Sequence, residues 1–212
     1  MHTINMQTWS RSEHFKFFHS FDHPHFGVCA NVDLTKFQPY IKQNGISFSI
    51  AIVYAIARAA NAIPEFRLRI RAEEVVEHEV VHPSSTILIK DDLFSFCDFE
   101  YTENFSLFAE KASKQIAHVK EHPILENIPG RDDMLYMTAI PWISFTGFMH
   151  PMQLHPADSV PRFAWGKYFE ENAMIKMPLG VQAHHALMDG IHLGRFYKQM
   201  QEFLHHPDLI LK

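Results

Sequence analysis

The chain has 212 residues, of which 47 % are hydrophobic and 20 % charged, as expected for one folded globular domain covering residues 1–212. A net charge of -5 argues against nucleic-acid binding, which usually depends on a basic excess. The two cysteines, Cys29 and Cys97, are too few for a disulfide framework, and no apolar run approaches the roughly 18 residues of a membrane span. Because no signal segment is recognised either, a cytoplasmic location is expected.

Five stretches carry helical spacing or helix-start signals. The stretch 47–62 is apolar on nearly all sides, which predicts a buried helix, and Pro64 favours its end. The final helix is predicted from Phe196, Met200, Phe203 and Leu204. The predicted helices are Ser10 or Ser12 to about His19, Lys36 to Gln43, Ser47 to Ala62, Asn104 to His122, and a last helix from about Gly190 to near His206.

Short alternating or apolar runs between these helices predict strands. They are Gly27 to Val32, Leu68 to Ile70, Val75 to His82, Thr86 to Lys90, Phe94 to Tyr101, Leu135 to Ile140, Ser144 to Phe148, Arg162 to Glu170 and Ala173 to Ala183. Loops are expected over 123–133 and over the proline-rich stretch 149–161. Strands and helices are mixed irregularly, which indicates an α/β protein with a mixed or antiparallel sheet.

The most informative stretch is His184-His185-Ala186-Leu187-Met188-Asp189-Gly190, between the last predicted strand and the last helix. Histidine ordinarily titrates near pH 6.5 and is a suitable general base at neutral pH. Successive side chains of a strand point to opposite faces, so only one of the two histidines is expected to enter a site. The spacing alone does not say which one.

Asp189 has two candidate roles, as the N-cap of the following helix or as a charge partner within a site. Arg195 and the distant Arg11 are both candidate partners. The spacing of His185, Asp189 and His192 would also suit a transition metal on one helix face, although Gly190 weakens a continuous helix there. A serine hydrolase lacks support, because the sequence contains no Gly-x-Ser-x-Gly elbow.

The histidine stretch resembles the His-His-x-x-x-Asp-Gly motif of acyltransferases that use coenzyme A or carrier-bound acyl groups. Further segments resemble the chloramphenicol O-acetyltransferase family in particular, in family order over nearly the whole chain. They are Trp9-Ser10-Arg11-Ser12-Glu13-His14-Phe15, Asn61-Ala62-Ile63-Pro64-Glu65-Phe66-Arg67, Ala139-Ile140-Pro141-Trp142-Ile143-Ser144-Phe145, Gly166-Lys167-Tyr168, Met177-Pro178-Leu179 and Val181-Gln182.

The resemblance implies a two-layer sandwich, with a mixed, largely antiparallel sheet covered by helices, and a homotrimer with active sites between subunits. It implies acetyl-CoA as co-substrate, no tightly bound cofactor or metal, and chloramphenicol as acceptor. His185 is implied as the catalytic base, His184 as structural, and Asp189 as the ion-pair partner of Arg11. Tyr168 falls where the family contacts the coenzyme, and the residues implied near the acceptor are Phe17, Phe18, Phe26 and Phe94.

The chain departs from the family pattern at three places. Thr138 stands where the family usually has a serine that stabilises the oxyanion, and its methyl group restricts the side-chain rotamer. Ala164 replaces a threonine hydroxyl, and the stretch from Met149 to Met152 is unusual beside the acceptor pocket. These departures keep two alternatives open: an acetyltransferase of the same fold with another hydroxylated acceptor, and a non-catalytic protein that binds the drug or the coenzyme.

Overall fold

The computed structural model describes residues 1–126 and 128–212, so the predicted loop 123–133 includes one residue, Asn127, outside the described part. Five helices are found in the described chain where the sequence predicts them, and these predictions are confirmed to within two residues. The helices are α1 (Ser12–His19), α2 (Phe37–Gln43), α3 (Phe48–Asn61), α4 (Phe105–Glu121) and α5 (Gly190–His205).

The strands of the described chain form a seven-stranded and a three-stranded sheet. The large sheet has the order β2-β10-β8-β7-β5-β6, with β9 added beside β10; β7 is parallel to β5 and β8, and the other pairs are antiparallel. The small antiparallel sheet has the order β1-β4-β3. The strands are β1 (His2–Thr3), β2 (His25–Asp33), β3 (Leu68–Arg71), β4 (Glu74–Glu77), β5 (His82–Leu88), β6 (Phe94–Asp98), β7 (Met134–Ile140), β8 (Arg162–Gly166), β9 (Phe169–Glu171) and β10 (Met174–His184).

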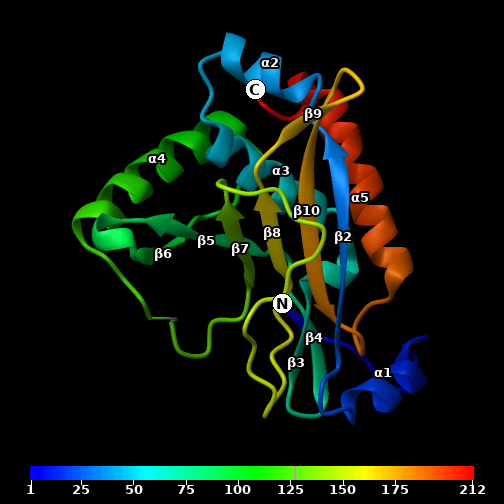
Figure 1. Cartoon of the computed structure of the whole chain (residues 1–212). Coiled ribbons are helices and arrows are strands. Elements are labelled where there is room, and N and C mark those ends of the chain that lie inside the picture. The colour runs from blue at the N-terminus through cyan, green and yellow to red at the C-terminus, as the bar shows by residue number, and fades with distance from the viewer. Residues whose placement is uncertain (127) are drawn as a thin grey trace.

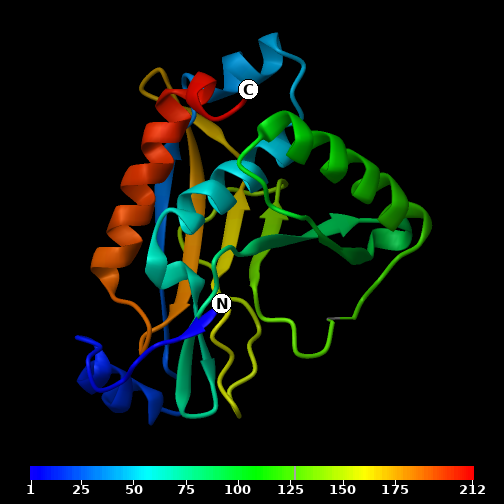
Figure 2. The same ribbon diagram turned by 180° about the vertical axis from the view of Figure 1, so that it is seen from behind.

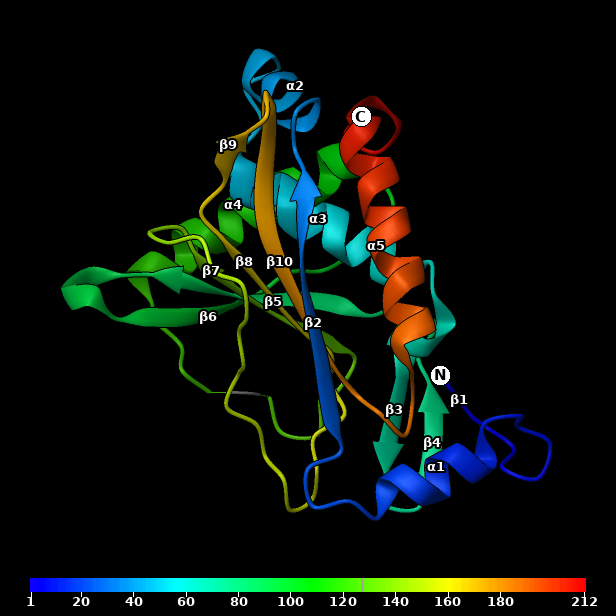
Figure 3. The ribbon, with the colours of Figure 1, turned by 45° about the vertical axis from the view of Figure 1, so that its right-hand side comes forward.

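Helices cover one face of the large sheet, and the connection from β7 to β8 crosses the other face (Figures 1 and 2). Helix α3 is buried over most of its length, because its Ala- and Ile-rich surface packs on the sheet, on α4 and on α5. The small sheet lies beside α1, below the large sheet (Figure 3). The predicted α/β class with a mixed, largely antiparallel sheet is confirmed.

One predicted strand, Ser144 to Phe148, is wrong, since no strand is assigned over these described residues. Both edges of β7 are already paired with β5 and β8, so the chain leaves the sheet after Ile140 and crosses its face. There it lies directly on Gly166, where an added Cβ would come within 2.8 Å of the carbonyl oxygen of Ile143. The apolar residues that suggested a strand therefore pack on the sheet face.

Two other predicted strands are divided. The predicted strand Val75 to His82 ends at Glu77, because the chain passes there from the small sheet to the large one. The bend is held by hydrogen bonds from the His78 amide to the Arg67 carbonyl and from the Val81 amide to Asn61 Oδ1. The predicted strand Arg162 to Glu170 breaks after Gly166, opposite Pro178, which has no N–H for the sheet ladder. The short strand β1 was not predicted. Strand β5 runs from His82 to Leu88, so it begins and ends earlier than the predicted Thr86 to Lys90, and β6 ends at Asp98, before the predicted Tyr101.

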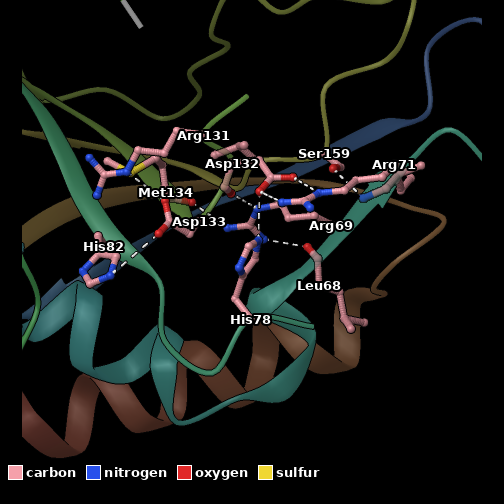
Figure 4. Close-up of polar contacts among 12 residues, drawn as sticks. Leu68, Arg69, Arg71, His78, His82, Arg131, Asp132, Asp133, Met134 and Ser159 are labelled. Atoms are coloured by element: carbon pink, nitrogen blue, oxygen red, sulfur yellow. Dashed lines mark hydrogen bonds and ion pairs between the residues drawn. The ribbon is translucent and has the colours of Figure 1, made fainter. Parts of the chain in front are cut away.

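A buried arginine joins the two sheets (Figure 4). Arg69 of β3 is fully buried and donates to the carbonyl oxygens of Asp132 and Met134, both at 2.6 Å, and to those of Phe66 and Leu68. Burial lowers the pKa of Arg69 to about 10, so the side chain remains charged at neutral pH. Its charge is balanced by the Asp132 carboxylate, which accepts hydrogen bonds from Arg71 and lies 2.9 Å from His78 Nε2.

Because of this cluster, we expect the stability of the folded protein to fall at acid pH. Burial alone would raise the pKa of Asp132, but hydrogen bonds from His78 and Arg71 outweigh it and hold that pKa well below its ordinary value. A depressed folded-state pKa contributes stability that is present above the unfolded pKa of about 3.9 and is lost as the pH falls below it. We expect D132N to destabilise the protein at pH 6, and the difference from the wild type to shrink below about pH 4. Urea unfolding at several pH values measures this, and a constant difference down to pH 3 would contradict it.

Candidate active site

The two adjacent histidines lie at the end of β10, where the strand passes into a turn before α5. The pairing of β10 with β2 continues to the last residue, His184, which lies opposite His25. The amide of His185 then donates to the carbonyl oxygen of Pro24 at 2.8 Å. The turn that carries the candidate base is therefore anchored to β2 on one side and begins a helix on the other.

His184 points into the protein. Its side chain is only 1 % exposed, and its Nδ1 accepts a hydrogen bond from the Ala186 amide at 3.2 Å. Burial lowers the pKa of His184 to about 3, so its ring is neutral at physiological pH. A buried neutral ring cannot reach a substrate, so the structure leaves His185 as the candidate base.

His185 lies between two of the phenylalanines that the resemblance places near the acceptor. Its ring stacks on Phe18, with centroids 3.9 Å apart and planes 5° apart, and contacts Phe26 at 4.4 Å. Nδ1 of His185 lies 3.1 Å from Asp189 Oδ1, but the two atoms are not aligned as a hydrogen bond. Within the described part of the chain, Nδ1 has no hydrogen-bond partner. The side chain is 31 % exposed. With Nδ1 on the Asp189 side, Nε2 is the nitrogen available to a bound molecule.

Asp189 forms an ion pair with Arg11, which lies 178 residues earlier in the chain. Both carboxylate oxygens accept from the guanidinium, and Nη2 lies 2.7 Å from Oδ1. Arg11 also donates to the carbonyl oxygens of His185 at 2.6 Å and Ala186 at 3.0 Å. Hydrogen bonding to Arg11 holds the pKa of Asp189 below its ordinary value. The arginine therefore binds the turn by its backbone as well as by the aspartate.

Asp189 is the N-cap residue of α5 and forms a capping box with His192, the third residue of the helix. The backbone amide of Asp189 donates to His192 Nδ1 at 2.8 Å, and His192 Nε2 lies 3.3 Å from Glu65 Oε1. His192 is thus turned away from His185. No group of three or more metal-binding side chains is found among the described residues, so the metal alternative gains no support.

The Arg11 contacts predict unequal effects at the two ends of the ion pair. Arg11→Ala removes the contacts to Asp189 and to two carbonyl groups, whereas Asp189→Ala removes only the carboxylate. We expect each variant to lose about 1–3 kcal/mol of stability and to lower kcat, with the larger loss for Arg11→Ala. Thermal melting and turnover measure the two effects. Lys16→Ala, which removes an exposed pair with Glu13 on α1, is the control and should change little. Unchanged melting temperatures in both site variants would contradict the proposed role of the pair.

Other residues implied by the resemblance lie away from His185 within one chain. Thr138 pairs with Ala164, and Ala164 with Gly180, which is five residues before His185 on β10. At ~3.3 Å per residue and ~4.8 Å per strand, Thr138 and His185 are separated by well over 10 Å. Phe94 is on β6, at the far edge of the sheet from β2 (Figure 1), and Tyr168 lies beyond β8, against Phe48. Phe17 is on α1 beside Phe18 but is 60 % exposed. Of the residues implied by the resemblance, one chain brings Asp189, Arg11, Phe18 and Phe26 together at His185, with Phe17 exposed beside Phe18.

The structure adds a polar cluster that the sequence analysis missed. It lies on the sheet face opposite the helices and consists of His25, His150, Asp158, Arg162 and Gln182. Gln182 Oε1 accepts from the His150 amide at 2.7 Å, and the carboxylate of Asp158 accepts from Arg162. The sequence held one signal for it: Gln182 and His184 are polar residues two apart in the apolar second half of their strand, which places both on one face.

The described part of the chain contains no helix that is long and apolar enough to cross a membrane. The layered sheet, with its histidine pair at the end of a central strand, defines the coenzyme A-dependent acyltransferase fold. A solved dihydrolipoamide acetyltransferase from Azotobacter vinelandii shares this fold, with a TM-score of 0.69 at 15 % identity over 89 % of this chain and 84 % of that one.

The family is shown by closer relatives. The family model for chloramphenicol acetyltransferase matches residues 1–201. A chloramphenicol acetyltransferase from Klebsiella is 32 % identical over 95 % of this chain and 92 % of its own length. A solved chloramphenicol acetyltransferase has a TM-score of 0.87 at 30 % identity, over 95 % of this chain and 98 % of that one. The chain belongs to the chloramphenicol acetyltransferase family and is an acyltransferase.

Proposed function

We propose that this protein transfers the acetyl group of acetyl-CoA to the 3-hydroxyl of chloramphenicol, with His185 as the general base. The observation that carries the proposal is the placement of His185: its ring is held between Phe18 and Phe26, its Nδ1 faces Asp189, and its Nε2 is left for a substrate. The names of the relatives support the choice of substrates, and the position of His185 supports its role as the base.

In the proposed reaction, Nε2 of His185 removes the proton of the acceptor hydroxyl while the oxygen attacks the thioester carbonyl. The tetrahedral intermediate carries a negative charge on the former carbonyl oxygen. Collapse of the intermediate breaks the carbon–sulfur bond, forms the acetyl ester, and returns the proton from the imidazolium to the thiolate of coenzyme A. This sequence balances without a covalent enzyme intermediate or a metal.

We assign Thr138 as the hydroxyl that donates a hydrogen bond to the oxyanion. Loss of such a donor typically costs roughly 10²–10³ in kcat. Thr138→Ala should therefore lose turnover by about that factor, whereas Thr138→Ser keeps the hydroxyl and should remain near the wild-type rate. Steady-state turnover of the two variants measures this. Equal turnover of the alanine and serine variants would remove Thr138 from the mechanism.

Because Thr138 and His185 are distant in one chain, we propose that the complete site forms between subunits of a trimer. Large apolar side chains are exposed on the β5–β6 end of the sheet and on the segment after β7, and burial against another copy would remove them from water. They are Leu88, Leu93, Phe94, Trp142, Ile143 and Met149. Light scattering should give a mass three times the 24.7 kDa of one chain, and a monomer active at all concentrations would contradict the shared site.

A second candidate is acetyl transfer to a different hydroxylated small molecule. Two residues on the sheet face that also carries Thr138 favour this candidate. They are Ala164, which lacks a hydroxyl, and the buried Arg162 of the polar cluster. Tyr168 is proposed to contact the coenzyme in either case.

One experiment separates the candidates. Release of the coenzyme A thiol from acetyl-CoA is measured with chloramphenicol, with its 3-deoxy analogue and with a panel of other hydroxylated compounds. We expect release with chloramphenicol and none with the 3-deoxy analogue. Release only with another acceptor would support the second candidate, and tight binding with no release at all would indicate a non-catalytic protein.

A further inference from the structure

Two buried ring nitrogens lie next to residues 185–189, the turn between β10 and α5 that carries His185 and is called the catalytic turn below. Within residues 1–126 and 128–212, His184 Nε2 and His25 Nδ1 have no hydrogen-bond partner, although the two side chains are 1 % and 9 % exposed. The residues are opposite each other on β10 and β2, so their side chains lie on the same face. Their ring centroids are 5.2 Å apart in an edge-to-face arrangement. Buried polar atoms are normally paired, so this juxtaposition requires an explanation.

In each ring, the hydrogen bond made by the second nitrogen shows which of the two nitrogens carries the proton of the neutral form. His184 Nδ1 accepts the Ala186 amide, so the proton of the neutral ring is on Nε2. His25 Nε2 lies 2.5 Å from the carbonyl oxygen of Asp158, which can only accept, so that proton is on Nε2 and Nδ1 carries a lone pair. The unpaired atoms are therefore a donor on His184 and an acceptor on His25. Burial lowers the pKa of both rings, which favours these neutral forms.

We propose that His25 is a positioning residue for the acyl transfer, which accepts a hydrogen bond from His184 Nε2–H and donates one to the Asp158 carbonyl. A small rotation about χ2, a soft torsion in histidine, brings donor and acceptor together. The bond holds the tautomer of His184, and that tautomer is the one able to accept the Ala186 amide. The assignment of a positioning role rests on the proposed function of His185.

The same residue reaches the loop on the acceptor side of the sheet. Asp158 belongs to the connection 149–161, and its carboxylate holds Arg162 and the Val160 amide, the latter at 2.7 Å. His25 also follows Pro24, whose carbonyl accepts from the His185 amide. His25 thus joins the loop to the start of the catalytic turn, at His184 and His185. A shift of His184 would release the Ala186 amide and move His185 relative to Phe18 and Phe26.

Two substitutions separate the contacts of His25. His25→Asn keeps an acceptor oxygen close to the position of Nδ1 but loses the donor to Asp158. His25→Gln keeps an amide donor close to Nε2 but loses the acceptor for His184. His23→Gln is the matched control, because His23 is an exposed histidine two residues away in the same segment. The readouts are kcat and KM by thiol release, and the ring ¹⁵N and N–H resonances of His184 in the ¹⁵N-histidine-labelled protein.

We expect the wild type to show His184 protonated on Nε2. His25→Gln should shift that resonance and lower kcat roughly 10-fold with little change in KM for acetyl-CoA, since misplacement of a catalytic group by about 1 Å can cost up to 10²-fold. His25→Asn should keep the resonance and most of kcat, and His23→Gln should match the wild type.

A wild-type His184 protonated on Nδ1 would overturn the proposal even if a variant failed to fold. Equal losses in the asparagine and glutamine variants would also overturn it, because they indicate a merely structural role. The resonances do not depend on turnover. A wild type that releases no thiol with any acceptor would therefore refute the proposed function while leaving the His25–His184 pair open to test.

Discussion

Replacing His185 by glutamine is expected to lower kcat for acetyl transfer by roughly 10²–10⁴-fold, the usual contribution of a general base. Glutamine fills much of the space between Phe18 and Phe26 but cannot accept the hydroxyl proton at neutral pH. The melting temperature should stay close to that of the wild type, because the His185 side chain is partly exposed. Its Nδ1 also makes no aligned hydrogen bond with Asp189 or with any other described residue.

The measurement is thiol release from acetyl-CoA at saturating acceptor, with thermal melting in parallel. His23→Gln again serves as the control for a nearby exposed histidine. Turnover of H185Q within a few-fold of the wild type would refute His185 as the base. A loss of turnover together with a large drop in melting temperature would mean that the ring acts through folding.

The largest effect on stability is expected at Arg69. Arg69→Met removes a fully buried guanidinium and leaves the carbonyl oxygens of Phe66, Leu68, Asp132 and Met134 without that donor. Each buried polar group left unsatisfied costs about 1–3 kcal/mol, partly offset because a buried charge no longer has to be desolvated. A net loss of about 3 kcal/mol is expected. It corresponds to a fall in melting temperature of roughly 6–12 °C for a chain of this size.

Arg71→Met is the matched control for this prediction. Arg71 lies on the same strand and binds the same Asp132, but it is 41 % exposed, and exposed ion pairs contribute about 0–1 kcal/mol. Differential scanning calorimetry of the two variants compares burial directly. Similar melting temperatures for R69M and R71M would show that the buried guanidinium does not hold the two sheets together.

Much of the fold could be predicted because its signals are local. Helical periodicity and end signals such as Pro64 predicted the helices, and alternation predicted most strands of the large sheet. The one strand that is wrong as a whole would have lacked a free edge to pair with. The stretch 144–148 has a strand-like composition, but β7 already has a neighbour on each side, and strand order is not encoded in any single segment.

For the site, the sequence by itself determined the family, the histidine pair, the order of the motifs that resemble the family and the reaction class they imply, because these depend only on residue identity and spacing. Only the tertiary structure decided that His184 is buried while His185 is partly exposed between Phe18 and Phe26, that Arg11 also binds the backbone of the turn, and that His25 faces His184. It also placed Thr138 and Phe94 away from His185 within one chain. These contacts join residues far apart in sequence, and they follow from strand register and the packing of elements, which no local pattern specifies.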